Sequence, residues 1–289
     1  MSIPITDNHI HVNPIGALGP VKTAMLFNRS GGTTMFVPNL PTWDLNPTEP
    51  NNHKKAMQIT IKSVEKINNE TPVQAFAILG IHPIAYDKMI KEGYSIKKAK
   101  KVMFENLELA KKYVLDKKAV AIGEIGRPHY PVNKEILDEH NKILEYALNL
   151  ASDIDCPVQL HMEEANANTY NELYDLAKKT KISSYKIIKH YSNSEVLPSE
   201  THGITSSVNA SKKLIKEVLE KTHSNNIKPT FLMETDYMDN PHYPGRVLGP
   251  RTVPRRTLDY IKKGLMSEED AYIIHKENIE KIYDVDLTL

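Results

Sequence analysis

The chain has 289 residues, of which 40% are hydrophobic and 25% are charged. These proportions and a mean hydropathy of -0.44 are typical of a soluble globular protein, and they exclude an integral membrane protein and a largely disordered chain. The 37 basic and 36 acidic residues leave a net charge of +1, which excludes a global positive field for holding nucleic acid or anionic lipid.

The chain opens as MSIPITDNHI, without the basic residues and the apolar stretch of a secretory signal. Cys156 is the single cysteine, so no intrachain disulfide can form. No stretch approaches the roughly 18 apolar residues of a membrane span. We therefore expect a cytoplasmic protein with no membrane partner.

Short apolar segments alternate with longer segments of helical period along the chain, a pattern typical of parallel α/β proteins. In chain order, the predicted strands lie at residues 4–10, 33–38, 73–81, 119–124, 157–161, 186–190, 202–208 and 230–236. Between them, apolar residues recur at spacings of three and four, as in 136–148. The last predicted helix begins with a capping-box pair, Ser267 and Asp270, and continues with an apolar side formed by Ile274, Ile279 and Ile282.

Eight such units in 289 residues predict a (β/α)8 TIM barrel, an α/β fold that occupies residues 1–289 as a single domain. A doubly wound open sheet is the alternative architecture. The sequence contains no internal repeat, Gly/Ser linker or low-complexity tract that would indicate a second domain.

The first chemical signal is the pair of histidines in DNHIH, at the end of the first predicted strand. Side chains alternate along a strand, so Asp7, His9 and His11 share one face, which in a barrel can be the interior. Two imidazoles at the C-terminal end of a strand, where barrel active sites lie, indicate a metal site. We interpret Asp7 as a partner that orients one imidazole, with an ordinary strand-end carboxylate as the alternative.

Later predicted strands end in four more groups that bind metals, namely Glu124, His161, His190 and Asp236. Each one alone fits a structural role, as a helix cap or a hydrogen-bonded histidine. Six metal-competent groups on five strands, all at the catalytic end, favour a metal centre over coincidence. Glu234 shares the inward face of Asp236, so we interpret it as a partner of a ligating histidine.

The segments that carry these residues also form an ordered set. They are DNHIHVNP at 7–14, GIHP at 80–83, GEIG at 123–126, PVQLHMEEA at 157–165, IIKHYSN at 187–193 and METDY at 233–237. The set resembles the successive strand-end motifs of the TatD family of metal-dependent hydrolases, within the amidohydrolase-like barrels. The resemblance extends from residue 5 to about residue 284, where ENIEKIY is similar to that family's closing helix. It implies a (β/α)8 barrel that holds two divalent metals and hydrolyses phosphoester bonds in nucleic acid or a related ester.

The resemblance also implies a role for each ligand. His9, His11 and Asp236 would hold one ion, His161 and His190 the other, and Glu124 would bridge both. Asp236 would in addition accept the proton of the nucleophile, so Asp236 and Glu124 are the expected catalytic residues. A carboxylate can bridge because it has two oxygens, and two ions about 3.5 to 4 Å apart can share a hydroxide. The mixed nitrogen and oxygen ligands suit Zn, Mn or Mg.

The chain departs from the TatD pattern on the substrate side of the site. Ile84 stands where that family commonly has a second histidine, and Glu163, which would repel a phosphate, stands where a basic residue is frequent. GEIGRPHY replaces the usual GExGLD run and introduces Arg127 and His129. We expect His82 and Arg127 to bind substrate.

Positive charge returns in a Pro- and Gly-rich segment, PHYPGRVLGPRTVPRRT at 241–257, which is predicted to form a loop over the mouth of the barrel. It contains Arg246, Arg251, Arg255 and Arg256. Guanidinium groups bind phosphate bidentately, so we expect Arg251 to bind substrate. A loop held by surface salt bridges is the alternative.

The leading functional hypothesis is a binuclear metal hydrolase that acts on phosphoester bonds of a small molecule or nucleic acid, as a phosphodiesterase or deoxyribonuclease does. A lactonase, esterase or amidohydrolase with the same metal centre is the main alternative, and it would explain Glu163 and the missing second histidine. A non-catalytic metal-binding protein is the third hypothesis.

Overall fold

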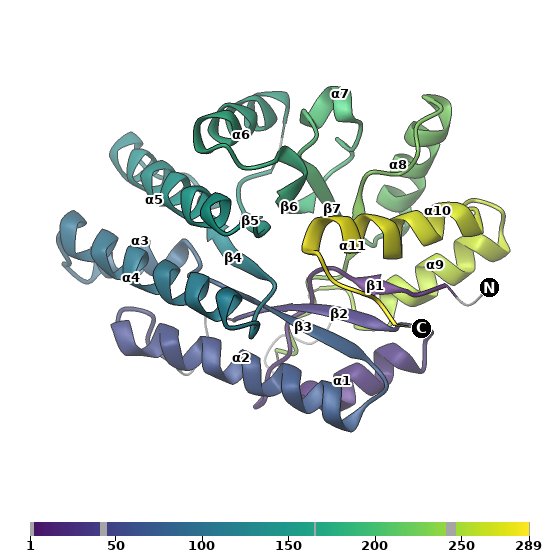
Figure 1. Ribbon diagram of the computed structural model, residues 1–289, viewed down its shortest axis with the longest axis horizontal. Coiled ribbons are helices and arrows are strands. Elements are labelled where there is room, and N and C mark those ends of the chain that lie inside the picture. Colours follow the sequence, from purple (N-terminus) through teal and green to yellow (C-terminus); the bar gives the residue numbers. More distant parts are fainter. Residues whose placement is uncertain (1–2, 41–44, 165, 241–246, 289) are drawn as a thin grey trace.

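The computed structural model describes residues 3–40, 45–164, 166–240 and 247–288. Eight parallel strands form one sheet whose spatial order follows the sequence, and helices surround it (Figure 1). The strands are β1 (Thr6–Asp7), β2 (Thr34–Pro38), β3 (Gln74–Leu79), β4 (Ala121–Gly126), β5 (Val158–His161), β6 (Ile187–Ser192), β7 (Thr205–Asn209) and β8 (Leu232–Glu234).

The sheet curls into a barrel that closes between β8 and β1. There the Asn8 N–H donates to the Met233 carbonyl at 2.9 Å, and a parallel bridge joins Ile10 to Tyr237. The predicted (β/α)8 barrel is therefore confirmed, and the open sheet is excluded. β1 is shorter than predicted because the Asp7 carboxylate accepts the His9 N–H at 3.2 Å and bends the chain out of regular pairing.

The helices alternate with the strands, as the spacing of apolar residues predicts. They are α1 (Gly19–Asn28), α2 (Pro50–Glu70), α3 (Ile84–Lys91), α4 (Ile96–Leu115), α5 (Lys134–Asp153), α6 (Ala167–Thr180), α7 (Pro198–Thr201), α8 (Lys212–Ser224), α9 (Thr252–Lys262), α10 (Glu268–Tyr272) and α11 (Asn278–Tyr283). A 3₁₀ turn, Ser184–Lys186, precedes β6, and a π-helical turn, Ile273–Glu277, joins α10 to α11. No described helix is long and apolar enough to cross a membrane.

The predicted start of the last helix is confirmed, since the Ser267 hydroxyl accepts the Asp270 N–H at 2.9 Å and the Asp270 carboxylate accepts the Ser267 N–H at 3.0 Å. One expectation nearby is wrong. The chain at 252–257 is the first part of α9 rather than a loop, so Arg255 and Arg256 are helical residues. Arg246 lies outside the described residues.

α11 packs against one end of the barrel and forms part of the core (Figure 1). The Tyr283 ring stacks on Phe36 of β2 with ring centroids 4.1 Å apart. The Tyr283 hydroxyl donates to Asn8 Oδ1 at 2.7 Å and receives a hydrogen bond from the Gln159 amide at 3.3 Å. A polar column therefore runs from this helix into the interior of the barrel.

Candidate metal centre

Six side chains from the ends of five strands converge on one side of the barrel interior. They are His9, His11, Glu124, His161, His190 and Asp236. The structure brings together all six residues that the sequence predicts as ligands, and their role as ligands stays a prediction. Glu124 lies at the centre, with each carboxylate oxygen facing a different pair of imidazoles.

One oxygen faces the group that we call the first half-site, which consists of His9, His11 and Asp236. Glu124 Oε2 lies 3.7 Å from Nε2 of His9 and 3.5 Å from Nε2 of His11. These two nitrogens are 3.1 Å apart, and Oδ1 of Asp236 lies 3.6 Å from each of them. Four donor atoms therefore surround one small space.

The other oxygen faces the second half-site, which consists of His161 and His190. Glu124 Oε1 lies 3.1 Å from Nδ1 of His161 and 3.3 Å from Nε2 of His190, and these nitrogens are 3.4 Å apart. Only a side chain with two acceptor atoms can face both half-sites at once, and Glu124 has them. Two groups of candidate donor atoms therefore share one carboxylate.

The backbone at the strand ends explains how these side chains reach each other. Asp236 has φ 53°, a left-handed conformation that aspartate tolerates better than most residues, and its N–H donates to the His9 carbonyl at 2.9 Å. Gly126 has φ +146°, and a Cβ there would lie 2.1 Å from the His161 carbonyl oxygen. The glycine therefore allows β4 to approach β5 closely enough for Glu124 to contact His161.

Fixed hydrogen bonds at the remaining ring nitrogens orient the imidazoles of the first half-site. His9 Nδ1 lies 2.7 Å from Oε1 of Gln159, and His11 Nδ1 lies 3.1 Å from the Pro38 carbonyl. Both oxygens are acceptors, so each Nδ1 carries the proton and each Nε2 keeps a free lone pair. That is the tautomer which can bind a metal through Nε2.

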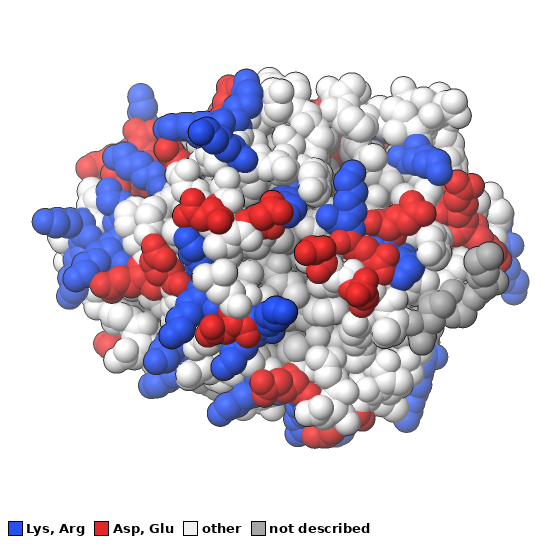
Figure 2. All heavy atoms as spheres, in the orientation of Figure 1, with Lys and Arg blue, Asp and Glu red and all other residues white. Residues whose placement is uncertain are grey.

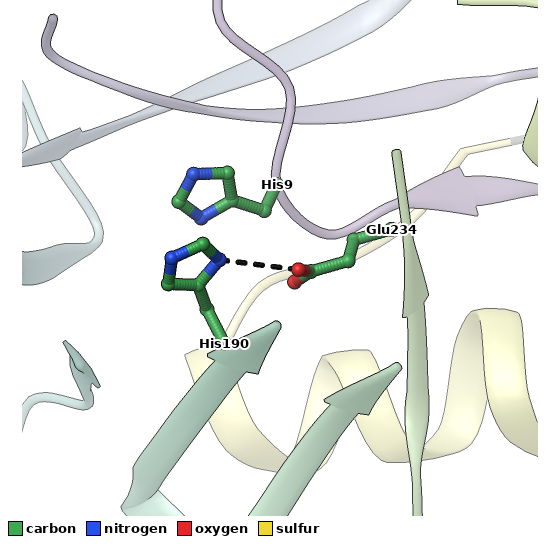
Figure 3. Close-up of side chains that lie close together, drawn as sticks. All are labelled: His9, His190 and Glu234. Carbon is green, nitrogen blue, oxygen red and sulfur yellow. Dashed lines mark hydrogen bonds and ion pairs between the residues drawn. The ribbon is translucent and has the colours of Figure 1, made fainter. Parts of the chain in front are cut away.

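Glu234 orients the imidazole of His190 through a contact with its Nδ1. Its Oε1 lies 3.1 Å from His190 Nδ1, as Figure 3 shows, and accepts the Tyr191 N–H at 2.8 Å. Its other oxygen accepts the Ser207 hydroxyl. The rings of His9 and His190 lie face to face in the same view, with centroids 4.0 Å apart. Glu234 is thus occupied by neighbours, which fits a partner of a ligand better than a ligand.

Asp7 was expected to orient one imidazole, but among the described residues its carboxyl group contacts no imidazole ring, and Gln159 is the partner of His9 Nδ1. The Asp7 carboxylate instead accepts the N–H groups of His9 at 3.2 Å and Thr235 at 3.1 Å, and its second oxygen lies 2.7 Å from the Thr235 hydroxyl. It therefore joins β1 to the end of β8. Burial raises the pKa of Asp7 to about 8, against the hydrogen bonds from Thr235.

Replacing Asp7 by Ala is expected to destabilise the metal-free protein by about 3 kcal/mol, because it leaves buried N–H groups without an acceptor. Asp7→Asn keeps an oxygen at that position and is expected to cost less. Burial raises the pKa of folded Asp7 to about 8, whereas the ordinary pKa of an aspartate carboxyl is 3.8. This group therefore lowers stability as the pH rises across that interval, and Asn removes this contribution. Urea unfolding at pH 5 and pH 8 measures both effects, and an equal pH slope in Asp7→Asn would contradict them.

Burial sets the charge of most of the site. It lowers the pKa of His9 far below the usual range and also lowers those of His11 and His161, so these imidazoles are neutral. Burial opposes ionisation of Glu124, but His9 and the hydrogen bonds from His161 and His190 overcome it and hold the Glu124 pKa well below its usual range. Neutral imidazoles around a carboxylate are the forms that bind cations.

His190 and Asp236 differ from the others. Burial opposes the charged form of His190, but Glu234 and Glu124 outweigh it and raise the His190 pKa to about 10. Burial raises the pKa of Asp236 to about 7, although His190 opposes that change. In the metal-free protein, a proton on His190 therefore balances part of the negative charge that a cation would otherwise balance.

The half-sites open into a cavity of about 390 Å³. His82, Lys88 and His129 contribute polar groups to its wall, and the apolar part of the wall is formed by Leu40, Leu45, Pro47, Ile84 and Met238. Within the described ranges, no salt bridge engages Lys88, which comes from α3. Lys88 therefore supplies a cation where the sequence predicted arginines.

His82 could be taken for a further ligand, since it lies with Glu124 and His161 in a group able to hold an ion. Its Nδ1, however, accepts the Ile84 N–H at 3.1 Å. Burial lowers its pKa to about 3, so the ring is neutral and its proton must lie on Nε2. His82 is therefore a hydrogen-bond donor beside the half-sites, which is consistent with the expected contact to substrate.

Arg127 lies away from the cavity. Its side chain is buried, and its Nη1 donates to Glu163 at 3.1 Å and to Glu172 of α6 at 2.7 Å. The expectation that Arg127 binds substrate is not supported by this position. Glu163 therefore has a fixed cation beside it, although Arg127 shares its single charge between Glu163 and Glu172.

The predicted arginine cluster also lies apart from the cavity in the described part of the chain. Arg251, Arg255 and Arg256 do not line it, and the Arg256 guanidinium donates to the Ala210 carbonyl at 3.3 Å. Sequence reasoning missed Lys88 and Gln159. Gln159 could have been found, because it precedes His161 by two residues and so shares its face of β5. Lys88 has no such signal.

The donor atoms fit a divalent cation. The group His9–His11–Glu124 places its candidate donor atoms within 4.8 Å of one another. Mixed imidazole and carboxylate donors of this kind suit zinc and manganese. The tautomers of His9 and His11 leave Nε2 unprotonated on the side that a cation would occupy.

The chain is similar to known proteins in sequence and in fold. The chain is 42% identical over 289 residues to an uncharacterized protein, MJ1127, of Methanocaldococcus jannaschii, covering 100% of this chain and 98% of that protein. Among solved structures, YjjV, a TatD homolog from Escherichia coli, has a TM-score of 0.65 at 18% identity, over 99% of this chain and 100% of that one. A mutant PTE-like lactonase from Deinococcus radiodurans has a TM-score of 0.66 at 12% identity, over 97% and 96%.

At these identities, the likeness to the two solved structures shows the fold alone. The family comparison is more specific, because the model described as TatD related DNase matches residues 6–284, nearly the whole chain. It confirms the resemblance carried by the strand-end motifs. The chain therefore belongs to the TatD family of metal-dependent hydrolases, and its histidines and acids form clusters that could hold a divalent metal ion.

Proposed function

We propose that this protein is a hydrolase with two divalent ions that cleaves phosphoester bonds of a small molecule or a short nucleic acid. The observation that carries the proposal is the position of Glu124, whose two oxygens face two different sets of imidazoles at 3.1 to 3.7 Å. The first half-site would hold one ion, the second half-site the other, and Glu124 both. Zn, Mn and Mg are the candidate ions.

Two bound ions would supply Lewis acidity and make a water molecule between them more acidic. The protein groups carry out the remaining steps. Asp236 is more exposed than Glu124, with 20% of its side chain exposed against 4%, and it lines the cavity. As an ionised carboxylate there, it would accept the proton of the attacking water and release it later. His82 would donate a hydrogen bond to the substrate from Nε2.

Lys88 supports a phosphoester substrate, because within the described residues no salt bridge engages its ammonium group at the cavity wall. Arg127 offsets part of the negative charge of Glu163 and Glu172. Figure 2 shows basic and acidic side chains interspersed over one face of the molecule, without an extended area of one sign. Anionic substrate would therefore be held locally, which favours a small or short substrate over a long duplex.

Replacing Lys88 by Met is expected to lower kcat/KM for a phosphodiester. The expected loss of transition-state stabilisation is about 1 to 3 kcal/mol, the scale of one charge-assisted hydrogen bond. The loss is expected to shrink at high salt, and turnover of a neutral lactone is expected to stay unchanged. Lys91→Met is the matched control, because Lys91 lies on the same helix but does not line the cavity. Equal losses for the phosphodiester and the lactone would refute this role of Lys88.

A specific observation favours one second candidate, a lactonase or related esterase or amidohydrolase. Much of the cavity wall is apolar, formed by Leu40, Leu45, Ile84 and Met238, and a neutral ring would pack there without any cation. The lactonase from Deinococcus radiodurans has the same fold. Both candidate functions use the same metal centre, so the substrate has to distinguish them.

The decisive experiment loads the metal-free protein with Mn²⁺ or Zn²⁺ and measures turnover of a phosphodiester dinucleotide, single-stranded DNA, a phosphomonoester, a lactone and an amide. The proposal expects the highest kcat/KM for a phosphoester. Fastest turnover of the lactone or amide would replace it with the second candidate. Metal binding without turnover of any substrate would support a non-catalytic metal-binding protein.

A further inference from the structure

His161 differs from the other imidazoles of the site in what holds its outer nitrogen. The outer nitrogens of His9, His11 and His190 each contact an oxygen, from Gln159, Pro38 and Glu234 respectively. His161 Nε2 instead lies 2.9 Å from Nδ1 of His129, a second imidazole that lines the cavity.

The geometry allows one arrangement of protons if His161 is to bind a cation. His161 Nδ1 faces Glu124 and His190, so it must be the nitrogen with the free lone pair. The ring proton of His161 then lies on Nε2 and is donated to His129 Nδ1. His129 accepts through Nδ1 and, as a neutral ring, carries its own proton on Nε2.

A set of partly buried contacts holds the segment that presents His129. The neighbouring Tyr130 donates its hydroxyl to Asp87 of α3 at 2.5 Å, and the His129 and Tyr130 rings meet edge to face with centroids 5.3 Å apart. The second Asp87 oxygen lies 2.8 Å from Nε2 of His140 of α5, which is fully buried. Asp87 thus ties the segment after β4 to two helices.

We infer that His129 is a positioning residue for His161, that Tyr130, Asp87 and His140 hold His129 in place, and that the second half-site depends on this unit for its affinity. The inference rests on the proposed metal centre. It gives a role to the imidazole that follows GEIGRP in this chain and to the half-buried Asp87 of α3. Partners that orient a ligating histidine typically change metal affinity by about 10- to 100-fold.

Three variants of His129 test the inference. They differ in where the new side chain carries an oxygen that can accept a hydrogen bond. Asn places an oxygen where His129 has Nδ1, Gln places one where it has Nε2, and Leu has none. Calorimetric titration of the metal-free proteins with Mn²⁺ is expected to show two ions in the wild type. In His129→Leu one of them should bind about 10- to 100-fold more weakly while the other is unchanged, and His129→Asn should restore it.

Each alternative result has a distinct meaning. Rescue by Gln instead of Asn would make His129 a ligand through Nε2 and overturn the inference, as would unchanged affinities in His129→Leu. A wild-type protein that binds neither ion would refute the proposed metal centre itself. The control is the thermal unfolding temperature of each metal-free variant. If it equals that of the wild type, a loss of affinity does not come from misfolding.

Two further measurements separate positioning from a general structural effect. Nitrogen-detected NMR of the Zn²⁺-loaded protein is expected to show a proton on Nε2 of His161 and none on Nδ1 of His129; the opposite assignment would overturn the inference. Tyr130→Phe is expected to weaken the same ion as His129→Leu. Tyr146→Phe is the matched control, since Tyr146 donates to Glu108 on the protein surface away from the site.

Discussion

Replacing Glu124 by Gln is expected to weaken both ions together, by at least about 100-fold each, since even the partners of metal ligands contribute 10- to 100-fold. Among the described residues, Glu124 is the carboxylate that faces both half-sites, whereas Gln has no negative charge and a single acceptor oxygen. Turnover should fall with the metal content. Elemental analysis after loading with Mn²⁺, together with calorimetric titration, measures the effect.

The matched control is Glu164→Gln, an exposed acid in the segment after β5. It removes the same charge near the mouth of the barrel and is expected to leave both ions bound. Loss of one ion from Glu124→Gln while the other keeps its wild-type affinity would show that Glu124 belongs to one half-site alone. The bridging assignment would then be wrong.

Asp236→Asn is expected to reduce kcat by roughly 10²- to 10⁴-fold, the usual contribution of a positioned general base. An amide cannot accept a proton at neutral pH, although its oxygen can still contact a cation. The metal content should therefore fall less than turnover does. Stopped-flow measurement of kcat at saturating Mn²⁺ separates the two effects.

The wild-type pH profile is the companion measurement for Asp236. In the metal-free protein the Asp236 pKa is raised to about 7 by burial, and a neighbouring cation would favour the ionised form and lower it. Activity that depends on ionised Asp236 should rise with pH to a plateau, and Asp236→Asn should lose that rise. A variant with full metal content and turnover within about tenfold of the wild type would assign the base to another group.

The sequence predicts the barrel and the convergence of its polar residues for the same physical reason. Parallel strands in consecutive order bring their carboxyl ends to one face, so groups that end strands far apart in the chain, such as His9 and His190, must meet. The short distances within the site could not be predicted. Glu124 lies 3.7 Å from His9 and 3.3 Å from His190, and the Nε2 atoms of His9 and His11 are 3.1 Å apart. Those distances depend on local backbone features such as the left-handed Asp236 and the close approach at Gly126.

Side-chain contacts between residues that are far apart in the sequence could not be predicted. Asp7 is two residues from His9 and on the same face, yet its carboxylate contacts β8 backbone, while Gln159 from β5 contacts the imidazole. Arg127 is similar, because its ion pair with Glu172 joins residues 45 positions apart. Sequence distance is a poor guide to contact where strands from opposite sides of a barrel share one interior.

The polar column from α11 connects the two ends of the barrel. Tyr283 contacts both Asn8 and Gln159, and Gln159 fixes the tautomer of His9. A cation that requires this tautomer of His9 also favours the Gln159 rotamer that Tyr283 supports, and so favours the docked C-terminal helix. By thermodynamic reciprocity, undocking of that helix would weaken the binding of the cation by the same factor. Docking of α11 and binding of a cation at the first half-site would thus be coupled through Tyr283 and Gln159.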